Sequence, residues 1–465
     1  MTTGNLTVAL ARYCRSADHD ALGDQARDIA KRSILDTLAC LMAGVASSEW
    51  PHVVTGLGLT EAGAAPVFGT RLRADKHISA LANGTAAHMD SFDDYVVRAG
   101  GHSGVSVIPA ALAAAPSGTT GKDLIAAVVA GYEVMTMFGD RMARASFERG
   151  HHATGTHGAV AASAAAARVA GLAEKALADA IGLGASQSSG LRVQFGSMAK
   201  PFQAGHAAMA GALSASLAAA GFTPSADPIG GVRGLVTAVA GEAERSRIVE
   251  ELLQLTARPP GELLVESPPT TKLHASCGST HSAVDCAIEL GRQLDRATLT
   301  RVRHIDISLP TKALATLVHH RPTTGLQAKY SVEFAVASGL FFGDAGRNRF
   351  VDAVVGDPLL KALTHAGEVH DEPAFQLRRE SDKFGGALPA RVVITLPERT
   401  LEAEVIHPLG SAQRPLAWEQ VAQKFAEHAD PVIGSAKASA AVAAIARLED
   451  IGDVRDDLLP LLIPA

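Results

Sequence analysis

The 465-residue chain has few aromatic residues, few cysteines and no long apolar or basic run. Aromatic residues make up 4% of the sequence, although apolar residues as a whole make up 47%. No uninterrupted apolar stretch reaches the roughly 20 residues that cross a bilayer, and the first residues lack the apolar core of a signal peptide. The 48 acidic and 42 basic residues leave a formal charge of −6 without a lysine or arginine block. We therefore expect a soluble protein with neither a membrane nor a nucleic-acid partner.

Familiar cofactor and metal motifs are also missing. The four cysteines form no CxxC pair, which favours a reducing cytoplasm over a disulfide scaffold. The sequence contains no phosphate-binding loop, GxGxxG, GxSxG or HExxH motif, so nucleotide binding, hydrolase chemistry and a zinc centre lose their usual support. His151, His152 and His157 are closely spaced, but the glycines among them argue against a rigid helical metal site. We expect no metal ion.

Alanine dominates the apolar residues and recurs at helical spacing, which predicts closely packed helices. Apolar residues repeat with this period from Asp24 to Gly44, and Gly44 is expected to end that helix as a C-cap. Further helices are expected at residues 103–115, 122–138, 157–170, 174–187 and 204–220. The first half of the chain is therefore predicted to be all-helical.

The character of the sequence changes after Pro268 and Pro269. Alternating apolar residues predict strands at 304–309, 392–396 and 401–406, the last two forming a hairpin with a loop of about four residues. Helices are also expected at 279–292 and 331–342, and alanine-rich helical patterns return from Trp418 to Ile463. The length favours two domains. We predict a mainly α fold: a large helical domain at 1–268, rejoined by 408–465, and a smaller α+β domain at 269–407.

Four segments concentrate polar residues within these alanine-rich surroundings. They read NGTAAHMDSFDD at 83–94 with GHSG at 101–104, HATGTHG at 152–158, GSMAKPF at 196–202 and KLHASCG at 272–278. Removal of a hydrogen next to a carboxylate requires a base at neutral pH and positive charge to hold the resulting enediolate. Histidine and lysine can supply both, because burial and neighbouring cations lower the pKa of a lysine towards neutrality. These segments are therefore candidates for an acid–base site.

Each residue type also permits a plainer interpretation. Lys200 and Lys272 could be a base and a carboxylate clamp in either order, or an exposed turn lysine and a hinge residue. His102 and His152 could be acid, base or oxyanion donors, or polar loop residues. The pair of residues 93 and 94 could orient those histidines or cap a helix. Cys277, close to Lys272 in sequence, is a weak candidate for a nucleophile.

The four segments, in this order, resemble the MmgE/PrpD family, and the resemblance extends over nearly the whole chain. It implies a large helical domain joined to a smaller α+β domain with the site between them, a homodimer, and a compact di- or tricarboxylate substrate handled without a metal or organic cofactor. Transferred by motif, the catalytic positions are His102, His152, Lys200 and Lys272. The substrate-binding or orienting positions are Ser91, Asp93, Asp94, Tyr95, His157 and Cys277.

The sequence departs from the family at two positions. Decarboxylase and dehydratase members carry an aspartate two residues before Asp93, where this chain has Ser91, and a threonine where it has Tyr95. Asp90 is displaced by one position, which rotates a helical side chain by about 100°. We therefore expect an epimerase of an iminodisuccinate-like dicarboxylate. The alternatives are a lyase, of the 2-methylcitrate dehydratase or cis-aconitate decarboxylase type, and a non-catalytic polycarboxylate-binding protein.

Overall fold

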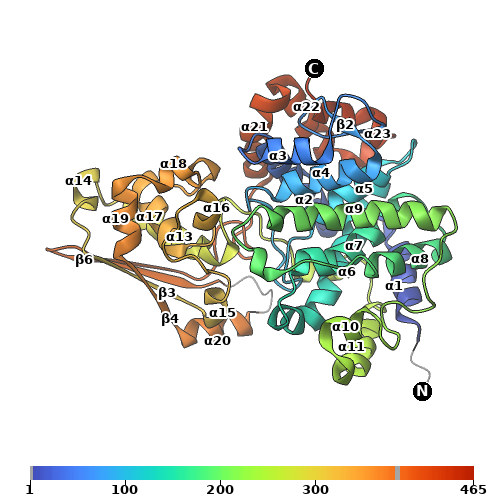
Figure 1. The fold of residues 1–465 in the computed structure, drawn as a ribbon, viewed down its shortest axis with the longest axis horizontal. Helices are drawn as coiled ribbons and strands as arrows, with labels where there is room; N and C mark the ends of the chain where they lie inside the picture. Colours follow the sequence, from blue (N-terminus) through green and yellow to red (C-terminus); the bar gives the residue numbers. More distant parts are fainter. Residues whose placement is uncertain (1–3, 383–387) are drawn as a thin grey trace.

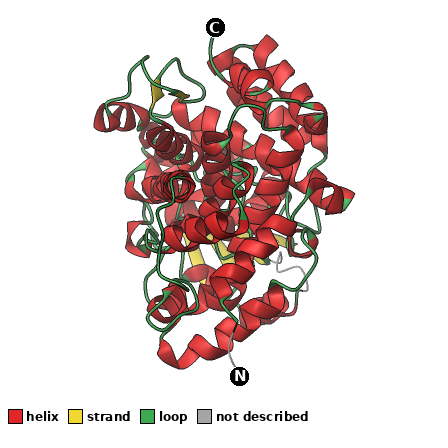
Figure 2. Ribbon diagram, turned by 90° about the vertical axis from the view of Figure 1, so that its right-hand side faces the viewer, coloured by secondary structure: helices red, strands yellow, loops and turns green. Residues whose placement is uncertain are grey.

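The structure is a computed structural model that describes residues 4–382 and 388–465. It consists of a large helical part and a smaller α+β part, which lie side by side in Figure 1. Seen from the helical end, helices make up nearly the whole face and the strands lie behind them (Figure 2). The predicted fold class, mainly α with a smaller α+β part, is confirmed. Within the described residues, no helix is long and apolar enough to cross a membrane.

The helical part combines the first half of the chain with its C-terminal segment. A single apolar cluster contains buried side chains from Leu6 to Leu264 together with others from Leu416 to Leu462, and the C-terminal helices lie above α2 in Figure 1. Its helices are α1 (Leu6–Ser16), α2 (Asp24–Val45), α3 (Trp50–Leu57), α4 (Lys76–His88), α5 (Gly104–Ala114), α6 (Gly121–Glu148), α7 (Ala153–Val169), α8 (Glu174–Ala185), α9 (Ala199–Ala219), α10 (Leu235–Ala240), α11 (Glu242–Leu255), α12 (Glu262–Glu266), α21 (Trp418–Ile433), α22 (Ser435–Ala446) and α23 (Val454–Asp457).

Close helix packing explains one difference from the sequence-based expectation. The helix α2 does not end at Gly44 but continues to Val45, with Ala46 as its C-cap. A Cβ atom at Gly44 would run into the backbone carbonyl of Ala86 on α4, so this glycine permits close approach rather than chain reversal. Gly205 on α9 has the same role against α4, where a Cβ atom would meet Thr85.

Other element boundaries also moved. The helix α7 begins at Ala153 and α9 at Ala199, four and five residues before the expected starts, and α6 continues ten residues past Phe138. Pro201 lies in the first turn of α9, where the missing N–H breaks no helical hydrogen bond. The first half is not entirely helical, because a short ladder joins β1 (Ala65–Pro66) to β2 (Arg73–Ala74). The earlier starts matter because they place His152 and Lys200 at helix N-termini.

The α+β part contains a sheet of order β4-β3-β5-β6 in the described residues, with β3 and β4 parallel and the other pairs antiparallel. The expected hairpin is confirmed, with residues 396–399 between β5 and β6. Strand β4 was not predicted. The strands are β3 (His304–Leu309), β4 (Gly367–Asp371), β5 (Ala390–Thr395) and β6 (Thr400–Val405). The helices are α13 (His281–Gly291), α14 (Arg296–Leu299), α15 (Thr311–Leu314), α16 (Gly325–Ala328), α17 (Val332–Phe342), α18 (Asp352–Val355), α19 (Pro358–Ala366) and α20 (Pro373–Ser381).

Apolar and polar contacts both join the two parts. A small cluster packs Cys40 and Phe92 against apolar side chains of the α+β part. The backbones of Tyr95 and Thr270 exchange two hydrogen bonds, of 3.0 and 2.8 Å. The loop after α4 therefore lies directly at the junction, together with the polar segments that the sequence singles out.

Candidate active site

Three helices begin at the same place in the helical part, and each carries one predicted catalytic residue there. His102 lies two residues before α5, His152 is the N-cap of α7, and Lys200 is in the first turn of α9. These residues are 9%, 4% and 3% exposed. Helix N-termini carry partial positive charge and unpaired N–H groups, which attract anions and disfavour added protons. The backbone alone therefore creates a buried region of positive potential at the N-termini of these three helices, in addition to any charge on the side chains.

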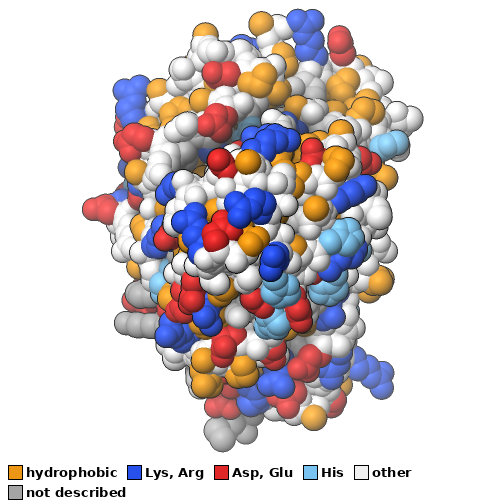
Figure 3. Space-filling view, turned by 90° about the vertical axis from the view of Figure 1, so that its left-hand side faces the viewer, with side chains coloured by type: hydrophobic (Ala, Val, Ile, Leu, Met, Phe, Trp, Pro, Cys, Tyr) orange, Lys and Arg blue, Asp and Glu red, His pale blue; other side chains and the backbone are white. Residues whose placement is uncertain are grey.

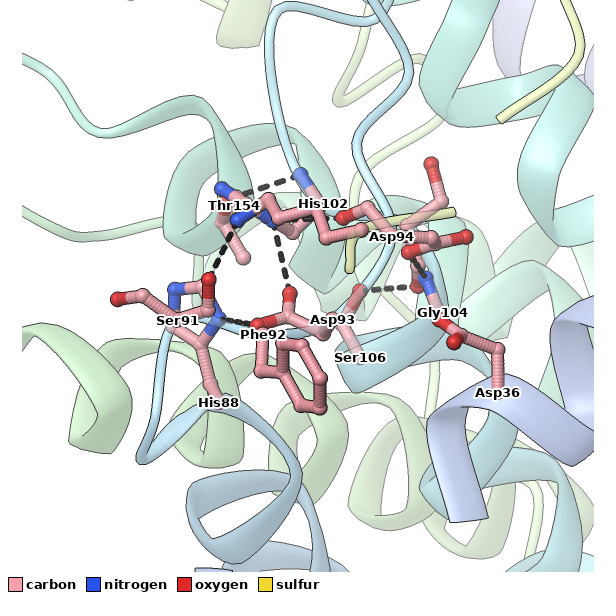
Figure 4. Close-up of polar contacts among 12 residues, drawn as sticks. Asp36, His88, Ser91, Phe92, Asp93, Asp94, His102, Gly104, Ser106 and Thr154 are labelled. Carbon is pink, nitrogen blue, oxygen red and sulfur yellow. Dashed lines mark hydrogen bonds and ion pairs between the residues drawn. The ribbon is translucent and has the colours of Figure 1, made fainter. Parts of the chain in front are cut away.

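Asp93 holds two of the imidazoles in fixed orientations. Its carboxylate lies 2.9 Å from Nδ1 of His88 and 2.8 Å from Nδ1 of His102 (Figure 4). Nδ1 of His102 is also 2.7 Å from the backbone oxygen of Asp94. Because every neighbour of these two nitrogens is an acceptor, both Nδ1 atoms carry the proton and Nε2 is left as the lone-pair nitrogen. Burial would raise the pKa of Asp93, but the two histidines outweigh it and hold that pKa well below 3.8.

Lys200 lies against the second nitrogen of His88. Its Nζ forms a short hydrogen bond to Nε2 of that ring, which completes a chain from Lys200 through His88 to Asp93. Burial lowers the pKa of Lys200 to about 7, with Lys272 adding to the shift and Asp93 opposing it. Burial also lowers the pKa of His88 to about 4, so this ring is neutral and accepts the bond. Lys200 therefore exchanges a proton near neutral pH.

His152 is oriented independently of Asp93. Its Nδ1 lies 2.7 Å from Oε1 of Gln203, whose amide nitrogen donates to the backbone of Leu191 and so fixes which amide atom faces the ring. Its ring centroid is 6.1 Å from that of His88 and 5.2 Å from that of Phe195. Burial and Lys200 hold the pKa of His152 well below 6.5. His102 is also held well below 6.5 by burial, which outweighs Asp93.

Lys272 and Lys424 are both buried but differ in how many acceptors they have. Nζ of Lys424, on α21, donates to Asp36 at 2.6 Å, to the backbone of Phe92 at 2.8 Å and to the backbone of Lys272 at 2.9 Å. A lysine has three N–H donors, so this one is saturated and structural. In the described residues Lys272 donates only to the backbone of Ser91, at 2.7 Å. It therefore has donors left for an anionic ligand.

Ser91 occupies the position where the sequence departs from the family. Its φ of 51° is in the left-handed region, which is uncommon for a residue other than glycine. Its hydroxyl lies 3.3 Å from that of Tyr330, and the Tyr330 ring stacks on Phe195 with centroids 5.5 Å apart. Both rings lie within about 6 Å of Nζ of Lys200. Ser91 thus belongs to a wall of the site made by two aromatic rings.

Asp90 does not replace the missing aspartate. Its carboxylate is 2.9 Å from Nζ of Lys329 and 2.9 Å from Nε of Arg347, both in the α+β part. Burial would raise the pKa of Asp90, but these two cations lower it below 3.8. Asp94 is structural as well: it accepts from the hydroxyl of Tyr132 at 2.6 Å and from the first amide of α5 at 3.2 Å. The two suggested roles of the Asp93–Asp94 pair are divided, with histidine orientation at Asp93 and helix capping at Asp94.

The remaining predicted residues separate into two groups. Burial raises the pKa of Tyr95, while the Arg379 charge acts against it, and the ring of Tyr95 lies 5.4 Å from that of His102. Cys277 is half-buried near Lys200, with its Sγ 3.6 Å from the hydroxyl of Thr316. His157 lies apart on α7, where it packs against Phe138 and has no hydrogen-bond partner among the described residues. The structure does not bring His157 to the histidines at 88, 102 and 152, and its role in binding stays a prediction.

Sequence reasoning did not select several residues of this site. His88 lies inside the first polar segment and Gln203 directly follows the third, so their positions on α4 and α9 were a usable signal. Arg379 on α20 gave no signal: it is partly buried, and its Nη1 has no hydrogen-bond partner in the described ranges. By atom type, His88, Asp93 and His102 could also ligate a metal ion. The neighbouring Lys200 opposes a further cation there, and both imidazoles already use Nδ1 on Asp93.

Taken together, the fold and site define a class of protein: a mainly helical protein with a small α+β part and a buried cluster of histidines and lysines. Family comparison identifies that class. The family model for the MmgE/PrpD N-terminal domain matches residues 8–247, and the model for the MmgE/PrpD C-terminal domain matches residues 274–450. The chain belongs to the MmgE/PrpD family, as its sequence motifs indicate.

Three fungal relatives are similar over much of the chain. A cis-aconitate decarboxylase of Aspergillus terreus (strain NIH 2624 / FGSC A1156) is 27% identical, covering 97% of this chain and 94% of its own. A second cis-aconitate decarboxylase of Aspergillus terreus is 28% identical over 70% of each chain. The cis-aconitate decarboxylase-like protein oryM of Aspergillus oryzae (strain ATCC 42149 / RIB 40) is 26% identical, covering 99% of this chain and 97% of its own.

Proposed function

We propose that this protein transfers a proton at a carbon atom next to a carboxylate of a small di- or tricarboxylate, without a metal or organic cofactor. One observation carries the proposal: Lys200, with a pKa of about 7, lies in one cluster with the neutral imidazoles of His102 and His152. Neutral imidazole and lysine ammonium are a matched base and acid near neutral pH. The buried, neighbouring lysines at 200 and 272 favour catalysis over simple binding, which would tolerate exposed and separated cations.

The proposed step conserves protons and electrons. Nε2 of His102 or His152 takes the proton from carbon, and the C–H electron pair moves into the carboxylate to give an enediolate. The free N–H donors of Lys272 hold the developing negative charge. The Lys200 ammonium then delivers its proton to carbon. Three helix N-termini supply further positive charge, as does Arg379, whose Nη1 has no partner in the described residues; this fits a substrate with two or three carboxylates.

For the reaction itself, we propose epimerisation of an iminodisuccinate-like dicarboxylate. Inversion needs only a base and an acid on opposite faces of one carbon atom. Ser91 has no carboxylate, and the nearby Asp90 is engaged by Lys329 and Arg347. The site therefore lacks the extra acid that the family's lyases carry at this position.

Decarboxylation of a cis-aconitate-like tricarboxylate is the second candidate, because three relatives that cover much of the chain are named cis-aconitate decarboxylase or its like. Loss of carbon dioxide leaves the same kind of carbanion, and Lys200 could protonate it. A homodimer, which the family resemblance implies, is part of the proposal and can be checked by sedimentation.

Proton NMR in heavy water separates these reactions. The purified protein is incubated with a panel of di- and tricarboxylates. Epimerisation predicts inverted product with deuterium at the inverted centre, and decarboxylation predicts loss of one carboxylate with release of carbon dioxide. Stereochemical inversion without deuterium would contradict proton transfer. Ligand-dependent thermal stabilisation without exchange or turnover on any member of the panel would contradict catalysis and favour a binding protein.

A further inference from the structure

A second cluster of histidines and carboxylates lies on the sheet of the α+β part, away from the acid–base site. His304 and Asp306 are two residues apart on β3, and Glu368 and His370 are two residues apart on the adjacent parallel strand β4. Residues two apart on a strand point to the same face. Asp306 pairs in register with Glu368 and His370 is opposite Ser308, so the four side chains form a staggered group across two strands, with the two histidines at its ends.

The separations within this cluster match those between ligands of one metal ion. Nε2 of His304 and Nε2 of His370 each lie 3.1 Å from the same Asp306 oxygen, and Nε2 of His304 is 3.5 Å from Glu368. The ligand atoms of His304, Glu368 and His370 all lie within 4.8 Å of one another. In a tetrahedral zinc site with bonds of about 2.0–2.2 Å, ligand atoms are roughly 3.3 Å apart. The side chains need only small rotations to share one ion.

The cluster is open to solvent. Burial alternates along β3, so His304 and Asp306 are on its half-exposed face, while the intervening Ile305 is buried. Exposed fractions of the four side chains range from 36% to 62%. On the β5 side, Asp306 is paired with the neutral Val393. The same face of β5 carries Arg391 opposite Ser308, but its guanidinium is paired with Glu402 at 2.6 Å. Histidine side chains gather beside acidic and basic ones on this end of the molecule (Figure 3).

We propose that His304 and His370, with Asp306 and Glu368, bind a divalent transition-metal ion of the zinc class. Two imidazoles with carboxylate oxygens are the donor set that Zn²⁺, Ni²⁺ and Co²⁺ accept, whereas Ca²⁺ and Mg²⁺ prefer oxygen ligands alone. The ion would join β3 to the edge strand β4 through side chains, in addition to the backbone ladder. It would have no part in the proton transfer proposed for the helical part.

Calorimetric titration of the full chain with ZnCl₂ tests this proposal, using protein without a histidine tag after removal of metal by a chelator. His304→Ala and His370→Ala should each weaken Zn²⁺ binding at least ~10-fold. His52→Ala, an exposed histidine on α3, should leave it unchanged. Co²⁺ should give the visible absorption of a tetrahedral site in the wild type and in His52→Ala, and lose it in the other two variants.

The acid–base site also contains residues that could bind a metal ion, namely His88, Asp93 and His102. The variants are therefore needed to show which of the two clusters binds Zn²⁺. Zn²⁺ binding that survives both His304→Ala and His370→Ala would overturn the proposal, as would the absence of binding in the wild type. Both histidines are about 40% exposed, so their replacement leaves the core intact, and circular dichroism verifies the fold. A Zn²⁺-dependent rise in Tm that both variants abolish would support the proposed link between strands.

Discussion

Nζ of Lys200 contacts Nε2 of His88, and the other nitrogen of that ring donates to Asp93. The contact puts the lysine at the end of a fixed, buried chain whose middle ring is neutral because burial lowers its pKa to about 4. A lysine that shares its proton with a neutral imidazole has no full counter-charge of its own. Burial, with a further contribution from Lys272, keeps the Lys200 pKa near 7 rather than near 10.5, although the Asp93 charge opposes the shift.

The first prediction concerns the pH dependence of activity. If the Lys200 ammonium is the proton donor, kcat/KM falls as pH rises through about 7, the pKa of the free enzyme. A bound polyanion stabilises the ammonium, so the alkaline limb of kcat lies at higher pH than that of kcat/KM. Initial rates measured from pH 5 to 9 test both statements. A kcat/KM that instead rises through pH 7 would make the Lys200 amine the base.

Replacement of Lys200 should raise the stability of the fold although it abolishes activity. Because its folded pKa of about 7 is below its ordinary value of 10.5, the unfolded chain binds more protons between those values, and the cost of burying Lys200 is complete below pH 7. Lys200→Met should therefore abolish turnover yet raise the unfolding free energy at pH 6 by roughly 1–4 kcal/mol. The gain should shrink towards pH 9. Urea unfolding at both pH values measures it, and a constant difference would contradict the lowered pKa.

Asp93 and Asp94 offer a matched pair of substitutions. Asp93→Asn replaces one acceptor oxygen by a donor, which forces one of the two histidines at 88 and 102 to flip or change tautomer. We expect kcat to fall by about 10²-fold or more, by analogy with other carboxylate-oriented histidines. Asp94→Asn keeps an acceptor for the α5 amide and should stay within about tenfold of wild type. Equal losses would show that Asp93 acts through folding alone.

Gln203 allows the pKa of His152 to be changed without loss of its hydrogen bond. Gln203→Glu keeps an acceptor oxygen 2.7 Å from Nδ1 and adds a negative charge, which raises the His152 pKa from its position well below 6.5. If His152 is the base, the acid limb of kcat/KM moves to higher pH. An acid limb that stays in place assigns the base to His102.

Arg379 should affect substrate binding more than chemistry. Its Nη1 is buried without a partner in the described residues, as expected for a guanidinium that binds a carboxylate of the substrate. Arg379→Gln should raise KM about 10-fold or more with a smaller change in kcat. The neighbouring Arg378, exposed and paired with Glu404, provides the control, because Arg378→Gln should leave KM unchanged. Equal effects of the two substitutions would remove Arg379 from the site.

The sequence could locate this site because chemistry-bearing residues interrupt otherwise apolar helices. His102, His152, Lys200 and Lys272 stand in four polar segments, and the structure brings all four together. Arg379 could not be found in this way, because an isolated polar residue on a half-exposed helix resembles any surface position.

Strand β4 and the starts of two helices were not predicted, for a related reason. The strand GEVHD at residues 367–371 is polar on both sides of Val369, because an edge strand with one solvated face needs little apolar sequence. Early helix starts were missed at α7 and α9, where the glycines and proline that suggested loops serve close packing and the first helical turn. Tertiary contacts, which a local sequence pattern does not contain, determine where these two helices begin.

Lys424 connects the end of the chain to its beginning. From α21 it holds Asp36, the backbone beside Asp93 and the backbone of Lys272, three points that are otherwise separated by long stretches of sequence. During synthesis, the first two of these points leave the ribosome long before α21 exists. The acid–base site therefore assembles only after nearly the whole polypeptide has been synthesised. A nascent or prematurely terminated chain could contain all four acid–base residues and still have no working site.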